Sequence, residues 1–298
     1  MRKTTLLLAS IILALVLACM AAVLSTAPGL AQTTTVTLVG AGDIASCHYT
    51  QDSATAKLLG NIPGTVFTLG DNAYPDGTAG QFRNCYKPTW GHYKKRTKPT
   101  AGNHDYYTSG ARAYFDYFGW RAGRPSQGYY SYKRGRWHIV ALNSNCDYVS
   151  CTRDSAQGRW LRHDLADHSA RCTLAYFHHP LYASGTGSDT PEVKPLWRIL
   201  YNRSADVILS GHAHRYERFR PITPNGEPDS ANGIRQFIVG TGGAPGEGQI
   251  GPDDPNVQRK KLGTPGVLKL NLGAGYYHWK FVHIAGKTFT DSGTNECH

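Results

Sequence analysis

Five short polar clusters carry the side chains of this chain that are best suited to chemistry. They supply carboxylate, phenol, amide and imidazole groups, and each follows an apolar run typical of a β-strand. The clusters are Gly42-Asp43, Gly70-Asp71-Asn72-Ala73-Tyr74, Gly102-Asn103-His104-Asp105, His178-His179-Pro180 and Gly211-His212-Ala213-His214. Ligands of open α/β sheets bind at the carboxyl ends of strands, so these distant clusters can meet in one pocket. Oxygen and nitrogen donors suit Fe, Mn, Zn or Mg, and paired ions can activate water, so the pattern predicts a two-metal hydrolase.

The second cluster offers two anionic ligands from one loop. Asp71 follows a predicted strand as Asp43 does, and its two carboxylate oxygens could bridge two cations. Tyr74 lies three residues later, and its phenolate is a hard anion that favours ferric iron over zinc. The alternatives are that each Gly-Asp pair only forms a turn and that Tyr74 packs beside Pro75.

The third cluster combines a neutral ligand with a candidate catalytic pair. Asn103 offers a carbonyl oxygen to a divalent ion, and His104 could donate a hydrogen bond to the substrate. We expect Asp105 to hold the His104 imidazole in the required tautomer. The alternative is an ordinary polar turn.

The last two clusters contain paired histidines with different spacing. His212 and His214 flank one residue, and in an extended backbone such side chains point the same way, toward adjacent metals. His178 and His179 are neighbours whose side chains should diverge, so we expect only one of them to be a ligand.

The pattern of elements predicts one α/β domain over residues 32–298. Helix candidates alternate with strand candidates, and further strands follow. Predicted strands before the clusters are Val36–Val39, Val66–Leu69, Thr97–Ala101, Thr173–Phe177 and Val207–Leu209. Predicted helices are Ser53–Leu59, Ala79–Trp90, Ala111–Phe118, Ser155–Ala166 and Val193–Tyr201. Later strands are Ile234–Val239, Gly266–Leu272 and Tyr276–Ile284, after a hairpin of Gly128–Lys133 and Arg136–Leu142. This order predicts a four-layer sandwich of two stacked mixed β-sheets flanked by helices.

The N-terminus has the features of a signal peptide, which we place at residues 1–31. A positive start at Arg2 and Lys3 precedes an apolar run, and small residues follow. The protein is therefore expected to be secreted or extracytoplasmic. An uncleaved membrane anchor and a lipoprotein attached through Cys19 are the alternatives.

Charge and cysteine content agree with export. The formal charge of +11 becomes +9 without Arg2 and Lys3 (11 − 2), but no basic run is long, so we expect solubility and no specific nucleic acid partner. Apart from Cys19, six cysteines remain, which favours disulfides and allows fifteen pairings. Possible pairs are Cys146 with Cys151, Cys47 with Cys85, and then Cys172 with Cys297.

The five clusters together resemble the calcineurin-like metallophosphoesterase superfamily. Tyr74 within Gly-Asp-Asn-Ala-Tyr points to its purple acid phosphatase branch, and the segment from Gly211 to Phe219 is similar to secreted bacterial members. The resemblance implies a first metal, Fe(III), and a second that is Fe(II), Zn or Mn. The implied first-metal ligands are Asp43, Asp71, Tyr74 and His214, and those of the second are Asp71, Asn103, His178 and His212. His104 would contact phosphate and serve as a general acid.

The resemblance implies an exported phosphatase that hydrolyses phosphomonoesters by attack of a metal-bound hydroxide on phosphorus. One departure is the loop Ala183–Ser188, which lacks a histidine that many small purple acid phosphatases carry there, and this affects the expected pH optimum and substrate preference. The alternatives are a phosphodiesterase or nuclease with the same fold, and a metal-dependent phosphate-binding surface module without turnover.

Overall fold

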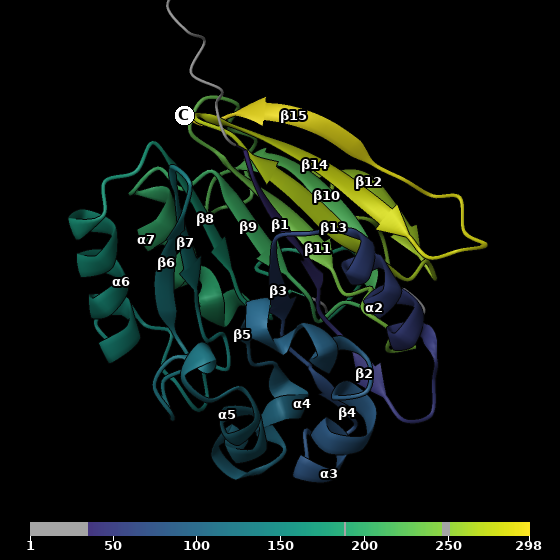
Figure 1. The fold of residues 1–298 in the computed structure, drawn as a ribbon. Coiled ribbons are helices and arrows are strands. Elements are labelled where there is room, and N and C mark those ends of the chain that lie inside the picture. The colour runs from purple at the N-terminus through teal and green to yellow at the C-terminus, as the bar shows by residue number, and fades with distance from the viewer. Residues whose placement is uncertain (1–34, 188, 246–250) are drawn as a thin grey trace, which may run out of the picture. The chain divides into compact units, whose positions relative to one another are not determined.

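The computed structural model describes residues 35–187, 189–245 and 251–298, so the predicted signal peptide lies outside the described residues. Two mixed sheets form the centre of the part from Thr35 onward (Figure 1). The first has the order β15-β14-β13-β1-β3-β5 and the second the order β12-β10-β11-β9-β8-β7-β6. Helices cover the outer sides, which confirms the predicted four-layer sandwich.

The six-stranded sheet combines the first strands of the domain with its last ones. Its members are β1 (Val36–Ala41), β3 (Thr65–Leu69), β5 (Thr97–Thr100), β13 (Gly266–Leu272), β14 (Tyr276–His283) and β15 (Ser292–Glu296). Strands β1, β3 and β5 are parallel neighbours, and β13 joins β1 in the antiparallel sense. The carboxyl ends of β1, β3 and β5 therefore lie at the same edge.

The seven-stranded sheet consists of strands from the middle of the chain. Its members are β6 (Tyr130–Arg134), β7 (Trp137–Ala141), β8 (Cys172–Tyr176), β9 (Val207–Ser210), β10 (Arg215–Ile222), β11 (Ile234–Val239) and β12 (Val257–Leu262). Strands β7, β8, β9 and β11 run parallel. A separate two-stranded pair, β2 (Ala45–Ser46) and β4 (Ala73–Tyr74), joins the segments that follow Asp43 and Asp71.

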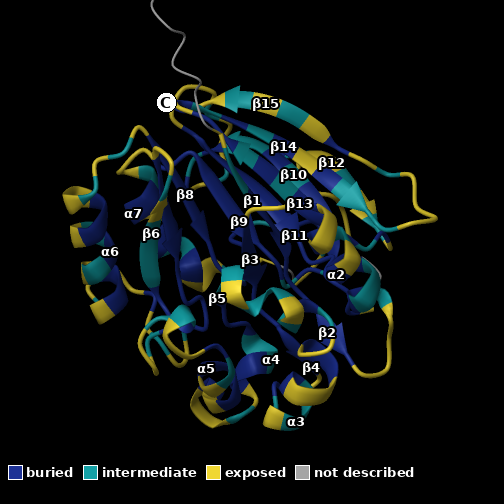
Figure 2. Ribbon diagram, viewed as in Figure 1, coloured by how far each residue is buried: buried dark blue, intermediate teal, exposed yellow. Residues whose placement is uncertain are grey.

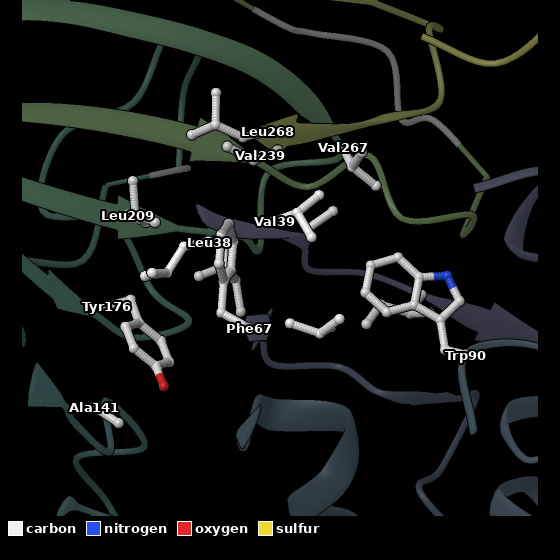
Figure 3. Close-up of a cluster of buried hydrophobic side chains, with 14 of the residues drawn as sticks. Leu38, Val39, Phe67, Trp90, Ala141, Tyr176, Leu209, Val239, Val267 and Leu268 are labelled. Atoms are coloured by element: carbon white, nitrogen blue, oxygen red, sulfur yellow. The ribbon is translucent and has the colours of Figure 1, made fainter. Parts of the chain in front are cut away.

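Alternating side chains of the second sheet enter two different cores. Leu174 and Leu209 join the core between the sheets. Leu209 lies near Leu38 and Phe67 there (Figure 3). Ala175, the neighbour of Leu174, faces the helices instead, together with Val140 and Ile208 on the adjacent strands. Both faces of these parallel strands are buried, which explains why they read in the sequence as continuous apolar runs (Figure 2).

The helices are mostly short. They are α2 (Gln51–Asn61), α3 (Ala79–Gln81), α4 (Asn103–Tyr106), α5 (Arg112–Phe118), α6 (Ala156–Asp167) and α7 (Lys194–Tyr201). Helices α6 and α7 cover the outer face of the seven-stranded sheet, and α2 packs against β13 on the other side (Figure 1). Ser155 caps the start of α6, because its hydroxyl accepts from the Gly158 amide. No helix among the described residues is long and apolar enough to cross a membrane.

One predicted helix is wrong. The segment Ala79–Trp90 forms α3, a five-residue π-turn over Phe82–Tyr86 and a separate 3₁₀ helix over Trp90–Arg96. Pro88 contributes to the break, because it has no amide proton to donate to the carbonyl four residues earlier. Thr78 starts the segment with a reciprocal cap that uses the Gln81 side chain.

Three disulfides bind the domain, with the pairings that the sequence favoured. Cys47–Cys85 and Cys146–Cys151 brace loops, and Cys172–Cys297 joins the start of β8 to the C-terminal end of the chain. The last bond closes a separation of 125 residues and links the two sheets, since Cys297 follows β15.

Candidate metal centre

The site forms where the parallel strands of both sheets end. Asp43 follows β1, Asp71 follows β3, Asn103 begins α4 after β5, His178 follows β8, and His212 follows β9. The structure therefore brings together all seven residues that the sequence proposed as metal ligands, from strands of two different sheets.

The backbone at this site is tightly folded. Gly70 has a φ of +83°, and a Cβ at this position would lie 2.5 Å from His178 Nδ1. A Cβ on Gly102 would lie 2.1 Å from an Asp71 carboxylate oxygen. These two glycines are needed because the ligand loops pass so close to one another. Asp43 and Asp71 themselves have φ values of 59° and 49°, which are uncommon for side chains other than glycine and typical of functional sites.

The phenol of Tyr74 lies at the centre of the first group. Its oxygen is 3.0 Å from Asp43 Oδ1, 2.9 Å from Asp71 Oδ2 and 3.0 Å from His214 Nε2. His214 donates its Nδ1 proton to the Pro245 carbonyl at 2.7 Å, so Nε2 presents a lone pair to the group. Burial and then the charges of Asp43 and Asp71 raise the pKa of Tyr74 well above its usual range.

One phenolic proton cannot satisfy three surrounding acceptors. Four atoms that could ligate a metal ion, three oxygens and one nitrogen, thus converge on one buried point. Two of the oxygens belong to carboxylates. A hard cation of high charge would neutralise this group, and a phenolate ligand suits ferric iron. The donor set fits the first metal ion that the sequence predicts.

The second group is arranged around His178. Its Nε2 lies 2.9 Å from Asn103 Oδ1, 3.3 Å from His212 Nδ1 and 3.4 Å from Asp71 Oδ2. Its Nδ1 donates to the Leu69 carbonyl at 2.7 Å. Burial would lower the pKa of His178, but the charge of Asp71 outweighs it and raises this pKa to about 9. The buried site thus attracts positive charge, as a cation site should, and this donor set suits a divalent ion.

Asp71 is shared by both groups. One oxygen, Oδ2, meets Tyr74 and His178, and the other accepts from the His104 amide at 2.9 Å. Burial opposes its ionisation, but the charge of His178 holds its pKa below the usual value. This position supports a bridging role.

His179 does not point away from the site as we expected. The His178 and His179 rings are nearly perpendicular, at 84°, but the centroid of His179 also lies 4.7 Å from that of His212. One nitrogen from each of these three histidines falls within 4.8 Å of the others. Ser144 explains this placement: its Oγ accepts from the His179 amide and meets His179 Nδ1 at 2.9 Å. Burial and then the charge of His178 lower the pKa of His179.

The segment from Gly211 to His214 is not extended, so the backbone reasoning for its two histidines is wrong. His212 has a φ of 68°, and the Ala213 amide donates to the Gly211 carbonyl. The two rings nevertheless reach adjacent groups, because the His212 amide is fixed by Asp43 Oδ2 at 2.9 Å. Burial and then the charge of His178 lower the pKa of His212 to about 4, so the ring is neutral and able to act as a ligand near pH 7.

His104 lies at the rim of the site. Its Nδ1 is 2.5 Å from the Pro75 carbonyl, and its Nε2 is 3.8 Å from Asp71 Oδ2. The side chain keeps 25% of its exposure, so a substrate can reach it.

Asp105 has a different role from the expected one. Its carboxylate accepts from the Gly102 amide at 2.9 Å and from the Asn72 side chain at 2.9 Å, and it does not orient His104. The reason is helical geometry: Asp105 is the third residue of α4, and its side chain turns back to cap the first turn. Burial and the charge of Asp71 raise its pKa to about 7. The carbonyl of Pro75 holds the His104 tautomer instead.

Two further residues at the site were not predicted as site residues from the sequence. Ser144 comes from the loop after β7 and fixes His179. Tyr107 follows α4, has 60% of its side chain exposed, and lies with its ring centroid 4.7 Å from that of His104. Ser144 lies in the stretch from Ala141 to Cys146, which is similar to secreted bacterial members of the family, but a serine and a tyrosine in loops are common and no role was predicted for either.

Comparison with known proteins shows which family the chain resembles. The family model described as "Calcineurin-like phosphoesterase" matches residues 36–216, which include every proposed ligand. Purple acid phosphatase 15 of Arabidopsis thaliana is 25% identical over 282 residues, an alignment that covers 80% of this chain and 50% of the plant protein. Purple acid phosphatase 22 of the same plant is 33% identical over 123 residues, covering 39% of this chain and 27% of that protein. The chain thus spans about half the length of the first of these relatives.

Solved structures share the fold. A purple acid phosphatase from yellow lupin (Lupinus luteus) seeds superimposes with a TM-score of 0.73 at 17% identity, over 89% of this chain and 54% of that one. GAP50 of Plasmodium, described as the anchor in the inner membrane complex, gives 0.68 at 14% identity over 89% of both chains. The family model matches more than half of the chain, and the site lies within the match, so this chain belongs to the calcineurin-like phosphoesterase family.

Proposed function

We propose that this chain is an exported dinuclear-metal phosphatase that hydrolyses phosphomonoesters. The observation that carries the proposal is the placement of Asp71 between two buried donor groups, one around Tyr74 and one around His178. Such a pair of adjacent sites, once loaded, supplies a nucleophilic oxygen at neutral pH and stabilises the attacking and leaving oxygens of an in-line displacement.

The two sites differ in the ions they favour. Asp43, Asp71, Tyr74 and His214 would hold a ferric ion, because three of these four ligands are anionic when bound. Asn103, His178 and His212 with the shared Asp71 would hold a divalent ion, Fe(II), Zn or Mn, because three of them are neutral. This asymmetry of charge is the basis for proposing a centre with one ferric and one divalent ion.

The remaining residues of the site handle the substrate. His104 has its Nδ1 fixed on the Pro75 carbonyl, so Nε2 faces the site and can donate to a phosphate oxygen or to the leaving group. Asp105 holds the turn that carries Asn103 and His104 and is thus a positioning residue. Tyr107 offers an exposed ring beside His104, which favours substrates with an aromatic leaving group.

Export is part of the proposal. Three disulfides join six cysteines in the described part of the chain, and such bonds persist in oxidising compartments. Residues 1–31 have the features of a signal peptide that would direct the chain there.

The test uses the chain purified aerobically from an oxidising compartment. Metal content, the visible absorption spectrum and the hydrolysis of an aryl phosphomonoester and an aryl phosphodiester are measured on the same preparation. We expect two metal ions per chain, a visible charge-transfer band from phenolate to ferric iron, and a higher kcat/KM for the monoester. A higher kcat/KM for the diester would establish a phosphodiesterase instead, and full metal loading without hydrolysis of either ester would establish a binding module.

A further inference from the structure

A second concave site lies away from the metal centre, on the outer face of the seven-stranded sheet. Helices α6 and α7 lie side by side on this face (Figure 1). The site is a cavity of about 460 Å³ between them, and its lining is rich in arginine. The lining residues are Arg153, Arg162, Pro195, Arg198, Ile199, Asn202 and Arg203. None of them belongs to the metal centre.

The four guanidinium groups of this arginine pocket are only weakly compensated. Arg153 pairs with Asp154 at 3.1 Å, and Arg162 lies 3.5 Å from the same carboxylate. Asp154 keeps 74% of its side-chain exposure, so these surface pairs contribute little. Arg198 and Arg203 form no side-chain hydrogen bond or ion pair with any residue in the described ranges. With Asp154 included, the formal charge is 4 − 1 = +3.

The arginines converge because α6 packs against α7. Arg153 precedes α6, Arg162 lies within it, Arg198 lies on α7, and Arg203 follows α7. The Arg162 guanidinium also donates to the Arg153 carbonyl, which fixes the wall on the α6 side. Ile199 is buried and gives the pocket an apolar base. The guanidiniums therefore surround a cavity rather than forming a stripe along one helix.

The shape and chemistry select a compact anion. Large hydrophobic side chains that are exposed in the described part of the chain are Tyr49, Tyr107, Trp120 and Tyr148. None of these lines the pocket, so it has neither a stacking platform for single-stranded nucleic acid nor an apolar wedge for a membrane. Arginine forks bind phosphate bidentately, and two phosphate groups together carry about −3 to −4, which balances the pocket. Its volume lies in the range of small-molecule sites.

We propose that the arginine pocket binds a small anion with at least two linked phosphate groups, at a site separate from the metal centre. The linked phosphates span Arg198 and Arg203 on one side and Arg162 on the other, and Asn202 supplies an amide for a further oxygen. The ligand can be an inorganic polyphosphate or a nucleoside polyphosphate, which share this chemistry.

The test measures binding of imidodiphosphate, whose P–N–P link resists hydrolysis, to the full metal-loaded protein by calorimetry. The test variant is Arg198→Gln/Arg203→Gln. The matched control is Arg112→Gln/Arg136→Gln, which removes two exposed arginines elsewhere. We expect the test variant to lose one class of sites or to bind there about 100-fold more weakly, since two charge-assisted contacts are gone. The control should bind like the wild type, and all three proteins should keep their phosphatase activity.

The outcomes separate the possibilities. Equal affinity and stoichiometry in the test variant and the wild type would overturn the proposal. An equal loss in the control would also overturn it, because general surface charge would then explain the binding. Binding of a single-stranded oligonucleotide or of anionic phosphatidylserine vesicles that depends on Arg198 and Arg203 and exceeds that of imidodiphosphate would contradict it too. Tighter binding of an imido analogue of ATP would support the proposal and identify the ligand as a nucleotide. Absence of phosphatase activity with an intact arginine pocket would count against the proposed function alone.

Discussion

Replacing Asp71 by asparagine is the sharpest perturbation of the proposed centre. The substitution keeps the size of the side chain and removes one negative charge that both donor groups share. We expect Asp71→Asn to bind far less than two metal ions per chain and to lose phosphatase activity. The Tyr74 and His104 contacts at 2.9 Å can persist in part, because the amide still offers one acceptor oxygen.

The distances give the size of the effect. The position of His178 Nε2, 3.4 Å from Asp71 Oδ2, gives the distance at which a positive charge in the second group meets the carboxylate. At this distance, two unit charges of opposite sign attract by about 5 kcal/mol at an effective dielectric constant of 20. The buried carboxylate also costs desolvation energy that the amide does not, which offsets part of this interaction. We therefore expect the affinity for the divalent ion to fall by about 100- to 1000-fold, corresponding to roughly 3 to 4 kcal/mol.

Equilibrium dialysis in metal buffers measures this affinity, with elemental analysis of the dialysed protein and circular dichroism to verify the fold. Asp291→Asn is the matched control, since Asp291 is a buried carboxylate that accepts from Tyr216 and Arg218 away from the site. The control should keep both ions. Wild-type metal affinity in Asp71→Asn would refute the bridging role, and equal metal loss in both variants would show that the fold was damaged instead.

The remaining predictions concern a ligand, a histidine pair and a buried acid. Tyr74→Phe should abolish the visible absorption band while lowering kcat by less than Asp71→Asn does, because three first-metal ligands remain; an unchanged band would exclude phenolate ligation. His178→Ala should lose the second ion, whereas His179→Ala should retain both ions in elemental analysis, since Ser144 already engages its Nδ1; the reverse result would reassign the ligand. Burial raises the pKa of Asp206 to about 7, so the fold favours its neutral form. The neutral carboxyl group of Asp206 contributes stability that is fully present below about pH 4 and is lost as the pH rises through 7. Over this pH increase, the free energy of unfolding should fall more for the wild type than for Asp206→Asn. Parallel curves of unfolding free energy against pH would disprove this.

Most of the strands that carry the site could be predicted from the sequence because they are buried on both faces, and β5, which contains Lys98 and Pro99, is the exception to this pattern. Runs such as the one ending at Leu69 are continuous and apolar, and a polar cluster marks each end. The strands β10, β12 and β15 were missed for the opposite reason. β12 and β15 are edge strands with polar sequences, and β10 carries charged residues and Pro221. Their pairing follows from tertiary neighbours that local sequence does not reveal.

The identities of the proposed ligands were more predictable than the way they are held. His212 adopts a left-handed backbone because Asp43 fixes its amide, and this contact joins residues 169 positions apart. Asp105 caps α4 because a four-residue helix begins at Asn103, a local geometry that the motif does not specify. The arginine pocket was missed because its charges come from separate segments, each of which alone suggests only a solvated surface.

The tautomers of the site depend on backbone groups rather than on side chains. Leu69, Pro75 and Pro245 each offer a carbonyl to the Nδ1 proton of a histidine, so His178, His104 and His214 all present Nε2 to the centre. A carbonyl exists at every residue, so substitution at these three positions would leave the tautomers intact as long as the loops kept their path. The tautomers therefore depend on the path of the loops, which Gly70 and the Cys47–Cys85 disulfide help to fix. Changes that shift these loops should disturb the centre more than changes of side chain at the carbonyl positions.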